Sequence, residues 1–398
     1  MTRQPIIAHL SADFPDPFIE RKTPVIRALL ELTKDSFTHR VVSINRGAVA
    51  PFRTALAAIK GAGTPELEYE RRAFADGVAL SYRAPPRGIM HATMLRQLGN
   101  VIAQDMLREK QLPDLLIGHK LTVEGIAVAH AAAIVDRPYA LTIQGNTDVK
   151  ILRARPDLRP LFRRIFHGAA QVMSFAPWSL EAIEARLGSR AGSSTIVPPP
   201  TELDAILPPK TGGNGLLTIF HLHGLKNKNL SGLVAALHIL ERRGRKISLA
   251  IVGDGNDADR AAAKALVGDL ENVTFEGALS RDAIGERLNS ASAFVLPSRR
   301  ESFGLVFTEA LFAGCPIIYP EGRAVDGYFK DSAFALFVDP MKADQIAAAI
   351  ERMIDHEAET KSALRRWQDA GGPQIFARTS IKQNYTRALM EAVGEGSV

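Results

Sequence analysis

Glu301 and Glu309 lie in a segment whose residue types suit a phosphorylated, hydroxyl-rich ligand. An apolar run at 293–296 predicts a strand, and Gly304 allows the chain to turn into a helix that carries Glu309 and ends at Gly314. The start of such a helix presents free backbone N–H groups that favour an anion. The two carboxylates can accept hydrogen bonds from hydroxyls. The spacing therefore predicts a site for a ligand that carries both phosphate and hydroxyl groups.

The string around these glutamates, Pro-Ser-x-x-Glu-x-Phe-Gly followed by Glu-Ala and Gly-x-Pro, resembles the Glu-x7-Glu signature of family-4 retaining glycosyltransferases. Similar blocks run nearly continuously from about residue 217 to residue 338. The resemblance implies an α/β protein of GT-B architecture, in which two doubly wound parallel-sheet (Rossmann-like) domains face each other across a cleft. It also implies a nucleoside-diphosphate sugar, UDP- or GDP-linked, as donor and no further cofactor. No Asp-x-Asp metal box occurs near this half, so we expect a metal-independent enzyme.

The resemblance gives roles to charged residues of the donor half. Glu309 is expected to accept from ribose hydroxyls, Glu301 to hold hydroxyls of the transferred sugar, and Lys228 to neutralise the departing diphosphate. His223 stands where the family usually has an arginine, so Lys226 is a second source of positive charge, with a solvated basic turn as the alternative. Further donor contacts are expected at the turns of this half, from Gly253, Gly277, Ser302, Phe303, Gly304 and Leu305.

The first half supplies the other candidates for catalysis. Many relatives have a histidine in a Val-Thr-x-His-Gly block, and this chain has Gln144 in the corresponding Leu-Thr-Ile-Gln-Gly block. Glutamine forms hydrogen bonds but carries no charge, which is compatible with a mechanism that acts by positioning and electrostatics. His119 ends the preceding predicted strand and is a second catalytic candidate. A structural histidine is the alternative interpretation of His119.

The loop after the first predicted strand is the candidate acceptor site. Residues 11–21 resemble the Phe-Pro…Phe-Ile-x-Arg pattern of exopolysaccharide-type, colanic-acid-like members of the family. Asp13, Phe14 and Asp16 are therefore expected to contact the acceptor, with the two carboxylates as hydroxyl partners. A proline-rich turn between a strand and a helix explains the same residues equally well. The implied acceptor is a hydroxyl of a bacterial surface polysaccharide or exopolysaccharide carried on a lipid.

A basic segment between residues 153 and 164 also contains leucines and a phenylalanine. Basic charges with apolar neighbours suit anionic headgroups, so this segment is a candidate contact with an anionic membrane surface. A solvated helix face with buried leucines is the alternative. The arginines of the segment are Arg153, Arg155, Arg159, Arg163 and Arg164.

Alternating apolar runs and helical patterns predict parallel sheets in both halves. Residues 1–200 are interpreted as the acceptor-side domain, residues 198–215 as a linker rich in proline and glycine, and residues 215–372 as the nucleotide-sugar-binding domain. The resemblance implies that residues 373–398 cross back to the first domain. Strands are predicted near 6–10, 40–44, 78–82, 115–118, 140–143, 171–174, 195–197, 217–221, 248–252, 273–275, 293–296, 316–319 and 336–338, and helices near 18–32, 93–109, 122–134 and 375–393.

Composition limits the function classes. The chain has 398 residues, of which 46% are hydrophobic and 23% charged, as expected of two globular domains. The sequence contains no apolar run of about 20 residues, no recognisable signal peptide and one cysteine, Cys315. We therefore expect a cytoplasmic protein that is at most peripheral at the inner face of the membrane. The net charge of +6, without a nucleic-acid-binding motif, favours a negatively charged ligand or surface.

Two other functions are compatible with the same architecture. A nucleotide-sugar epimerase would share the two-domain shape, but more acid and base residues would be expected in its cleft. A non-catalytic nucleotide-sugar-binding pseudo-transferase would account for Gln144 and His223 at positions where relatives differ. Glu301, Glu309 and Lys228 are all present, however, and retaining transfer of a hexose remains the leading prediction.

Overall fold

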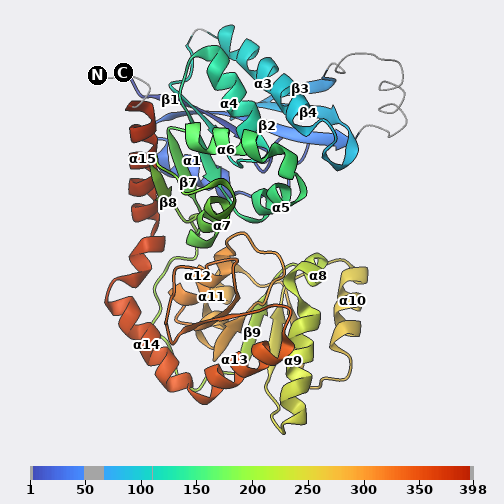
Figure 1. Ribbon diagram of the computed structural model, residues 1–398. Coiled ribbons are helices and arrows are strands. Elements are labelled where there is room, and N and C mark those ends of the chain that lie inside the picture. The colour runs from blue at the N-terminus through green and yellow to red at the C-terminus, as the bar shows by residue number, and fades with distance from the viewer. Residues whose placement is uncertain (1–2, 49–66, 110, 395–398) are drawn as a thin grey trace. The chain divides into compact units, whose positions relative to one another are not determined.

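Figure 1 shows the computed structural model of the protein, which describes residues 3–48, 67–109 and 111–394. The chain divides into two compact units. Unit 1 consists of Met1–Phe175, Ser179–Pro199 and Ile381–Val398, and unit 2 of Ala176–Trp178 and Pro200–Ser380. Each unit contains a twisted sheet with helices packed around it, and the chain returns to unit 1 with its last helix.

Unit 1 is built on an eight-stranded sheet of order β3-β4-β2-β1-β5-β6-β7-β8. All neighbouring pairs are parallel except β3 and β4, which pair antiparallel at the edge. The strands are β1 (Ile6–Ser11), β2 (Thr38–Ala48), β3 (Tyr69–Phe74), β4 (Gly77–Ala84), β5 (Leu115–Gly118), β6 (Tyr139–Ile143), β7 (Gln171–Ser174) and β8 (Ser194–Ile196).

Helices cover this sheet because successive side chains of its central strands point to opposite faces. Ala8, Leu10 and Leu116 pack on one face in a single apolar cluster with residues of α3, α4 and α6. The helices are α1 (Val25–Thr33), η1 (Pro86–Gly88), α3 (His91–Leu107), α4 (Glu124–Val135), α5 (Asn146–Ala154), η2 (Pro156–Leu158), α6 (Arg159–Gly168), α7 (Pro177–Leu187) and α15 (Arg378–Gly394).

Unit 2 contains a six-stranded, fully parallel sheet of order β11-β10-β9-β12-β13-β14. Its strands are β9 (Leu216–Ile219), β10 (Leu249–Val252), β11 (Val273–Gly277), β12 (Ala293–Val295), β13 (Ile317–Pro320) and β14 (Ala335–Val338). Its helices are η3 (Leu222–Gly224), α8 (Leu225–Lys228), α9 (Leu230–Arg242), α10 (Asp257–Val267), α11 (Arg281–Asn289), α12 (Leu305–Phe312), α13 (Ala343–Asp355), α14 (Glu357–Asp369) and η4 (Gly372–Phe376).

Each predicted strand has a counterpart in the structure, whereas β3 was not predicted. β3 lies at the sheet edge and its residues are mostly exposed, so its sequence lacks the apolar pattern of a buried strand. Two helices begin at least three residues later than predicted. α1 begins at Val25, directly after Pro24, instead of at Phe18. The last helix begins at Arg378, because Ala377 is extended between η4 and α15.

The predicted linker contains no regular helix or strand, but it is bound to unit 2. The backbone N–H of Leu207 donates to Phe312 O at 2.8 Å, and Asn289 Nδ2 donates to Pro208 O at 3.0 Å. The buried Lys361 ammonium donates to Lys210 O. Residues 200–215 therefore form a strap on unit 2 instead of a free connector.

Candidate active site

Two loops of unit 2 meet where the strand order of its sheet reverses. From β9 the chain continues to β10 on one side, and it later returns to β12 on the other side of β9. The carboxyl ends of β9 and β12 therefore flank a topological switch point, the usual ligand position in open α/β sheets. Lys228 follows β9 and Glu301 follows β12, and Lys228 Nζ lies 2.6 Å from Glu301 Oε2. Their side chains are 27% and 13% exposed, so the pair is reachable from solvent but partly desolvated.

The side chain of Asn229, next to Lys228, forms hydrogen bonds to the loop that carries Glu301. It is fully buried and adopts a left-handed backbone conformation, with φ of 61°. Its Nδ2 donates to Pro297 O at 3.1 Å and Pro340 O at 2.6 Å, and its Oδ1 accepts from Arg299 Nε at 2.9 Å. The backbone of Arg299 also donates to Asn227 O at 2.7 Å. The position of Lys228 relative to Glu301 is thus fixed by a buried side-chain amide.

Gly304 turns the chain from the Glu301 loop into α12. Its φ of 71° is left-handed, and a Cβ at this position would lie 2.8 Å from the Phe307 ring and 3.0 Å from Glu301 Cγ. A side chain is therefore excluded on both conformational and steric grounds. α12 begins at Leu305, and the N–H of Phe307 already donates to Gly304 O at 3.0 Å. The N–H groups that precede Phe307 at this helix start are the ones that can bind an anion.

Phe303 can contribute only its backbone to such a ligand. Its side chain is buried, and its ring packs edge-on against Tyr328 and Phe376, with 6.2 Å between ring centroids in each pair. Ser302, next to it, remains half-buried beside Glu301. The predicted contacts of residues 302–305 with phosphate are thus compatible with the geometry as backbone contacts.

Glu309 lies on α12, two turns beyond Glu301, and is half-buried. Its Oε1 accepts a hydrogen bond from Thr201 Oγ1 at 2.7 Å, and the same hydroxyl oxygen accepts from Leu203 N at 3.1 Å. Burial raises the pKa of Glu309, and the Thr201 hydrogen bond lowers it only in part. The carboxylate is therefore oriented by the strap before any ligand binds.

The two other basic candidates of the donor half point into solvent. His223 lies in η3 with its side chain 83% exposed, and its Nδ1 is 3.4 Å from Asp259 Oδ1. Lys226 is exposed on α8. Of the residues in this turn, Lys228 is the one that the structure brings to Glu301.

Gly253 and Gly277 lie together at the ends of β10 and β11, where Gly253 N donates to Gly277 O at 2.8 Å. A Cβ on Gly253 would lie 1.9 Å from Phe220 O, so this glycine allows β10 to end against β9. Around Gly277, which has φ of 71°, no atom lies within 4 Å of a Cβ position. A side chain at Gly253 would thus clash with the backbone of Phe220, whereas a side chain at Gly277 would meet no atom.

In unit 1, Gln144 and Asp13 lie at the carboxyl edge of the sheet. Gln144 directly follows β6 and is half-buried, and its Nε2 is buried without a hydrogen-bond partner among the described residues. Asp13 lies in the loop after β1, with its side chain 30% exposed, and forms an ion pair with Lys120 Nζ. Both side chains are therefore placed where a ligand of this fold would bind.

His119 belongs to the interior of unit 1, contrary to the catalytic role predicted from its sequence position. It is fully buried, and its Nε2 lies 3.0 Å from His9 Nδ1, whose ring in turn contacts His39 at 2.9 Å. Burial, with a contribution from the positive charge of Lys120, lowers the pKa of His119 to about 3. A neutral side chain without exposed atoms does not reach a substrate, so His119 is a structural residue.

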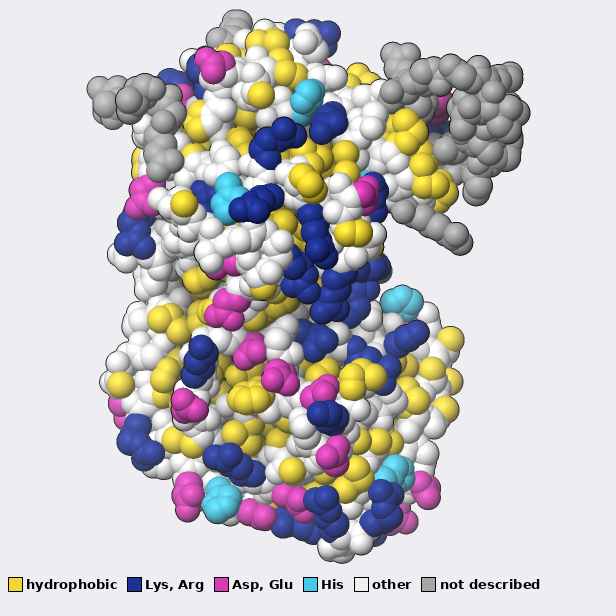
Figure 2. Space-filling view, in the orientation of Figure 1, with side chains coloured by type: hydrophobic (Ala, Val, Ile, Leu, Met, Phe, Trp, Pro, Cys, Tyr) yellow, Lys and Arg dark blue, Asp and Glu magenta, His cyan; other side chains and the backbone are white. Residues whose placement is uncertain are grey.

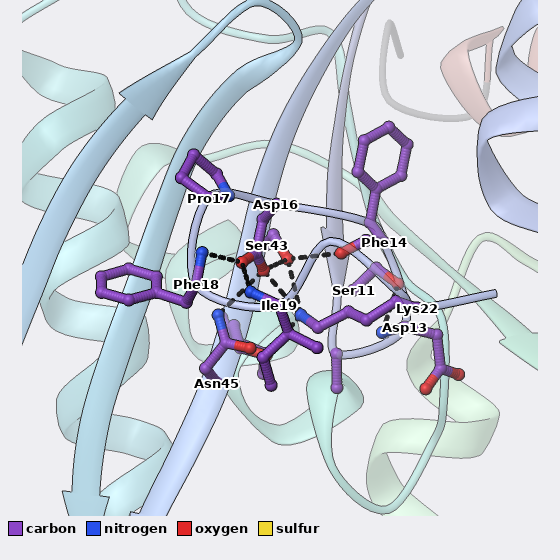
Figure 3. A network of polar contacts seen from close by, with 12 residues as sticks. Ser11, Asp13, Phe14, Asp16, Pro17, Phe18, Ile19, Lys22, Ser43 and Asn45 are labelled. Carbon is purple, nitrogen blue, oxygen red and sulfur yellow. Dashed lines mark hydrogen bonds and ion pairs between the residues drawn. The ribbon is translucent and has the colours of Figure 1, made fainter. Parts of the chain in front are cut away.

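Asp16 is also a structural residue and not the predicted acceptor contact. Figure 3 shows its carboxylate enclosed by donors, whereas the Asp13 carboxylate points away from it. Burial alone raises the pKa of a carboxyl group, but hydrogen bonds from several donors hold the pKa of Asp16 well below its usual range. These donors are Lys22 Nζ at 2.6 Å, Asn45 Nδ2 at 2.8 Å, Phe18 N at 2.8 Å, Ile19 N at 3.0 Å, and Ser43 Oγ.

Phe14, the third predicted acceptor residue, packs inside the loop. Its side chain is buried, with its ring centroid 6.1 Å from that of Phe74 and 5.1 Å from the guanidinium of Arg27. Of the three predicted acceptor residues, only Asp13 keeps an accessible polar group. The proline-rich turn, which was the alternative interpretation, describes Phe14 and Asp16 better.

The arginines of the basic segment between residues 153 and 164 also differ in their surroundings. Arg155 is engaged within unit 1, because it pairs with Asp157 at 2.6 Å and donates to Gly88 O. The other four arginines are exposed, and Lys and Arg side chains gather over α5 on the face seen in Figure 2. Burial, together with the positive charges of Arg153 and Arg159, lowers the pKa of Arg186. We call the four exposed residues, Arg153, Arg159, Arg163 and Arg164, the arginine patch, and Arg155 is excluded from it.

Comparison with known proteins finds a family model that matches part of the chain. Residues 210–371 match the family model of glycosyl transferases group 1. This segment covers unit 2 from β9 to α14, including Lys228, Glu301 and Glu309. The chain spans about a third of the length of the first two curated relatives it matches.

Individual relatives and solved structures are also similar to the chain. The chain is 25% identical over 236 residues to a GDP-mannose-dependent alpha-(1-6)-phosphatidylinositol monomannoside mannosyltransferase of Mycobacterium tuberculosis, covering 54% of this chain and 61% of that protein. Sucrose-phosphate synthase of Thermosynechococcus elongatus superposes with a TM-score of 0.68 at 18% identity, covering 99% and 100% of the chains. Anabaena Alr3699/HepE, solved with UDP and glucose, gives 0.61 at 16% identity over 98% and 100%. The GT-B fold predicted from the sequence is thus confirmed.

Two side chains that shape the site in unit 2 were not predicted from the sequence. Thr201 was treated as part of a linker, and its contact with Glu309 spans 108 residues, so no local pattern reports it. Asn229, the neighbour of Lys228, was given no role of its own. An asparagine between two short helical patterns is a signal for a left-handed turn, and that signal was available.

Proposed function

We propose that the protein is a glycosyltransferase that uses a nucleoside-diphosphate sugar and acts with retention, moving a hexose to a hydroxyl of a surface-polysaccharide or exopolysaccharide acceptor on a lipid carrier. The observation that carries the proposal is the Lys228–Glu301 pair at the switch point of unit 2, inside the segment that matches group 1 glycosyl transferases. A cation, a carboxylate and the start of α12 converge there, as a sugar diphosphate requires.

The chemistry follows from the charges at this point. The bond between the anomeric carbon and the diphosphate oxygen breaks, and its electron pair leaves with the diphosphate. Lys228 and the N–H groups of the first turn of α12 neutralise that charge. The acceptor hydroxyl then bonds to the anomeric carbon from the same face, and its proton passes to the departing phosphate. Glu301 holds the hydroxyls of the transferred sugar and Glu309 those of the ribose, so the enzyme acts chiefly by positioning.

Two observations support the acceptor part of the proposal. The Mycobacterium tuberculosis relative is named for a lipid substrate, a phosphatidylinositol monomannoside. The arginine patch of unit 1 lies on α5 and α6, and Lys and Arg side chains gather over α5 in Figure 2. Among the described residues, no helix combines the length and the apolar character needed to span a bilayer. Contact with a lipid-linked acceptor would therefore use this peripheral basic surface.

The proposed activity is tested by release of nucleoside diphosphate. Purified protein is incubated with UDP-, GDP- and ADP-sugars, with and without an extract that contains lipid-linked glycans. We expect one sugar nucleotide to release its diphosphate faster when the extract is present, with the anomeric configuration retained in the product. Binding of sugar nucleotides without any release would contradict the proposal and favour the pseudo-transferase. Epimerised donor in place of a new glycosidic bond would favour the epimerase.

The arginine patch is tested by flotation with vesicles that contain phosphatidylglycerol. Replacement of Arg159, Arg163 and Arg164 by glutamine should weaken vesicle binding about 10- to 150-fold, because each basic residue near an anionic surface contributes up to about 1 kcal/mol. The binding of the parent protein should fall as salt is added.

A matched control removes the same number of charges from unit 2. Arg243, Arg245 and Arg365 are each paired with a nearby carboxylate, so their replacement by glutamine should leave vesicle binding unchanged. Equal binding by the patch variant and the parent would contradict a role of the patch at the membrane. Nucleotide binding should remain intact in both variants.

A further inference from the structure

Two arginines from distant segments hold the turn that leads into α3 in unit 1. Arg46, near the end of β2, donates through Nη2 to Pro85 O, and Arg155, directly after α5, donates through Nη1 to Gly88 O. β2 and β4 run parallel and end side by side, so the turn after β4 lies at the carboxyl edge of the sheet. Ligands of open α/β sheets bind at this edge.

His91, the first residue of α3, follows this turn and offers a hydrogen-bond acceptor. The residue is half-buried, and its Nε2 lies 2.7 Å from Thr122 O. Because a carbonyl oxygen can only accept, Nε2 carries the proton and Nδ1 of the neutral ring is an acceptor. Nδ1 forms no hydrogen bond with a described residue and is not one of the fully buried unpaired atoms. The acceptor at Nδ1 is thus fixed in orientation and open to a ligand.

The charges around His91 are not balanced. Arg155 is 25% exposed and pairs with Asp157 through Nη2 at 2.6 Å and Nε at 2.8 Å, so its charge is compensated. Arg46 is exposed and has no ion-pair partner in the part of the chain that the structure describes. Burial lowers the pKa of His91, the hydrogen bond to Thr122 O opposes this in part, and the positive charges of Arg46 and Arg155 lower the pKa further. His91 is therefore neutral at pH 7 beside an uncompensated guanidinium group.

These two groups select the chemistry of a ligand. A guanidinium group has five N–H donors and suits phosphate, and Pro85 O occupies one donor of Arg46. The neutral imidazole of His91 accepts at Nδ1, so it binds a hydroxyl and not an ionised phosphate oxygen. A phosphate with a hydroxyl close to it, as in a phosphorylated sugar, satisfies both groups at once. If Arg46 served only to hold the turn, its charge would have no function.

We propose that Arg46 binds a phosphate group of the acceptor and that His91 accepts a hydrogen bond from a hydroxyl of the sugar that carries this phosphate. Arg155 is a positioning residue that fixes the turn before His91. The assignment to the acceptor rests on the proposed function, in which the donor phosphates bind to unit 2. The phosphate belongs to a free sugar phosphate or to the diphosphate that joins a sugar to its lipid carrier, and both present the same group.

The test is ligand-observed NMR on the full chain with sugar 1-phosphates of glucose, galactose, mannose and N-acetylglucosamine. The matched neutral probes are their methyl glycosides, and inorganic phosphate is followed by phosphorus NMR. We expect at least one sugar phosphate to bind the parent more tightly than its methyl glycoside does. Arg46→Gln should bind this sugar phosphate about tenfold more weakly.

His91→Gln separates the hydroxyl contact from the phosphate contact. Glutamine can still donate to Thr122 O but has no acceptor at the position of Nδ1. His91→Gln should therefore bind the sugar phosphate more weakly than the parent and bind inorganic phosphate like the parent. Equal weakening for both probes would contradict the hydroxyl contact.

Three control variants test where the phosphate binds and why. Arg108→Gln removes an exposed arginine, paired with Asp105, at the other end of α3 and should bind like the parent. Lys228→Gln should also retain sugar-phosphate binding, and loss there but not in Arg46→Gln would place the phosphate in unit 2 and overturn the proposal. Arg46→Lys keeps the charge and should recover most of the binding. If Arg46→Lys binds as weakly as Arg46→Gln, the arginine acts only by holding the turn.

Flotation with phosphatidylcholine vesicles, with and without a polyprenyl diphosphate, separates the two sources of phosphate. Binding that requires the polyprenyl diphosphate and is weaker in Arg46→Gln would assign the phosphate to the lipid carrier. Flotation that is the same in Arg46→Gln and the parent, together with weaker sugar-phosphate binding, would assign it to a free sugar phosphate.

The remaining outcomes separate this proposal from the proposed function. Equal binding of sugar phosphates and methyl glycosides by the parent, or equal sugar-phosphate binding by the parent and Arg46→Gln, would overturn the phosphate site. Binding of methyl glucuronide in place of sugar phosphates would overturn it as well. If sugar phosphates bind as expected but no sugar nucleotide is turned over, the site stands and the transferase function fails. Release of nucleoside diphosphate without any sugar-phosphate binding would have the opposite meaning.

Discussion

Alanine at Glu309 is expected to weaken the binding of free UDP or GDP about 10- to 150-fold, whereas alanine at Glu301 should leave that binding nearly unchanged and lower turnover instead. The range corresponds to the loss of a hydrogen bond to a charged group, about 1.5–3 kcal/mol. Glu309 is proposed to hold the ribose, a contact present before and during the reaction. Glu301 is proposed to hold the transferred sugar, where the contact matters most in the transition state.

The structure makes this contrast sharper. Glu301 pairs with Lys228 at 2.6 Å, so its removal leaves the lysine ammonium available to the diphosphate. Nucleotide affinity of Glu301→Ala should thus stay level or rise, while sugar transfer falls. Glu309, by contrast, is already oriented by the Thr201 hydroxyl. Thr201→Val should therefore weaken nucleotide binding, although less than Glu309→Ala does. Thr201→Ser keeps the hydroxyl and should bind nucleotide like the parent.

Calorimetry with free nucleotide and a transfer assay with the active donor measure the two effects separately. Glu321→Ala changes an exposed carboxylate of the same unit and is the control for loss of charge. If Glu301→Ala and Glu309→Ala both bind nucleotide and transfer sugar like the parent, the Glu-x7-Glu assignment fails. If both lose nucleotide affinity equally, the division of roles between ribose and sugar is wrong.

The fold could be predicted from the sequence because its signals are local. Short apolar runs such as 115–118 and 293–296 are buried strands in parallel sheets, and they are visible without any knowledge of their partners. The exceptions have local causes as well. β3 is an exposed edge strand without an apolar pattern, and α1 begins late because the Asp16 carboxylate accepts from the N–H groups of Phe18 and Ile19.

Only part of the candidate site could be predicted, because a sequence motif does not show which side chains are buried or which distant residues they contact. The segment that contains Glu301, Gly304 and Glu309 could be located, since its residues are close in sequence. His119 and Asp16 were misjudged because both are polar residues near a strand end, and only the packing shows that they are buried.

Alanine at Asp16 is expected to destabilise unit 1 by about 3–5 kcal/mol, because it leaves the Lys22 ammonium buried without a counter-charge. The side chains of Lys22 and Asp16 are 8% and 0% exposed, and the carboxylate also holds the turn before α1. Since the pKa of Asp16 is depressed on folding, its contribution is fully present above the ordinary pKa of about 4 and is lost only as the pH falls well below it. Measurements at pH 7 therefore report the full effect.

Hydrogen exchange of peptides from β1 and β2 should measure this loss, because both tryptophans, Trp178 and Trp367, belong to unit 2 and tryptophan fluorescence reports on the wrong unit. The double variant Asp16→Ala with Lys22→Met should be less destabilised than Asp16→Ala alone, since no buried charge is left unpaired. Asp76→Ala, which removes an exposed partner of Arg27 in the same unit, should change stability by less than about 1 kcal/mol. If Asp16→Ala exchanges hydrogen at the same rate as the parent but binds the acceptor more weakly, the structural interpretation is wrong. Asp16 would then contact the acceptor, as first predicted from the sequence.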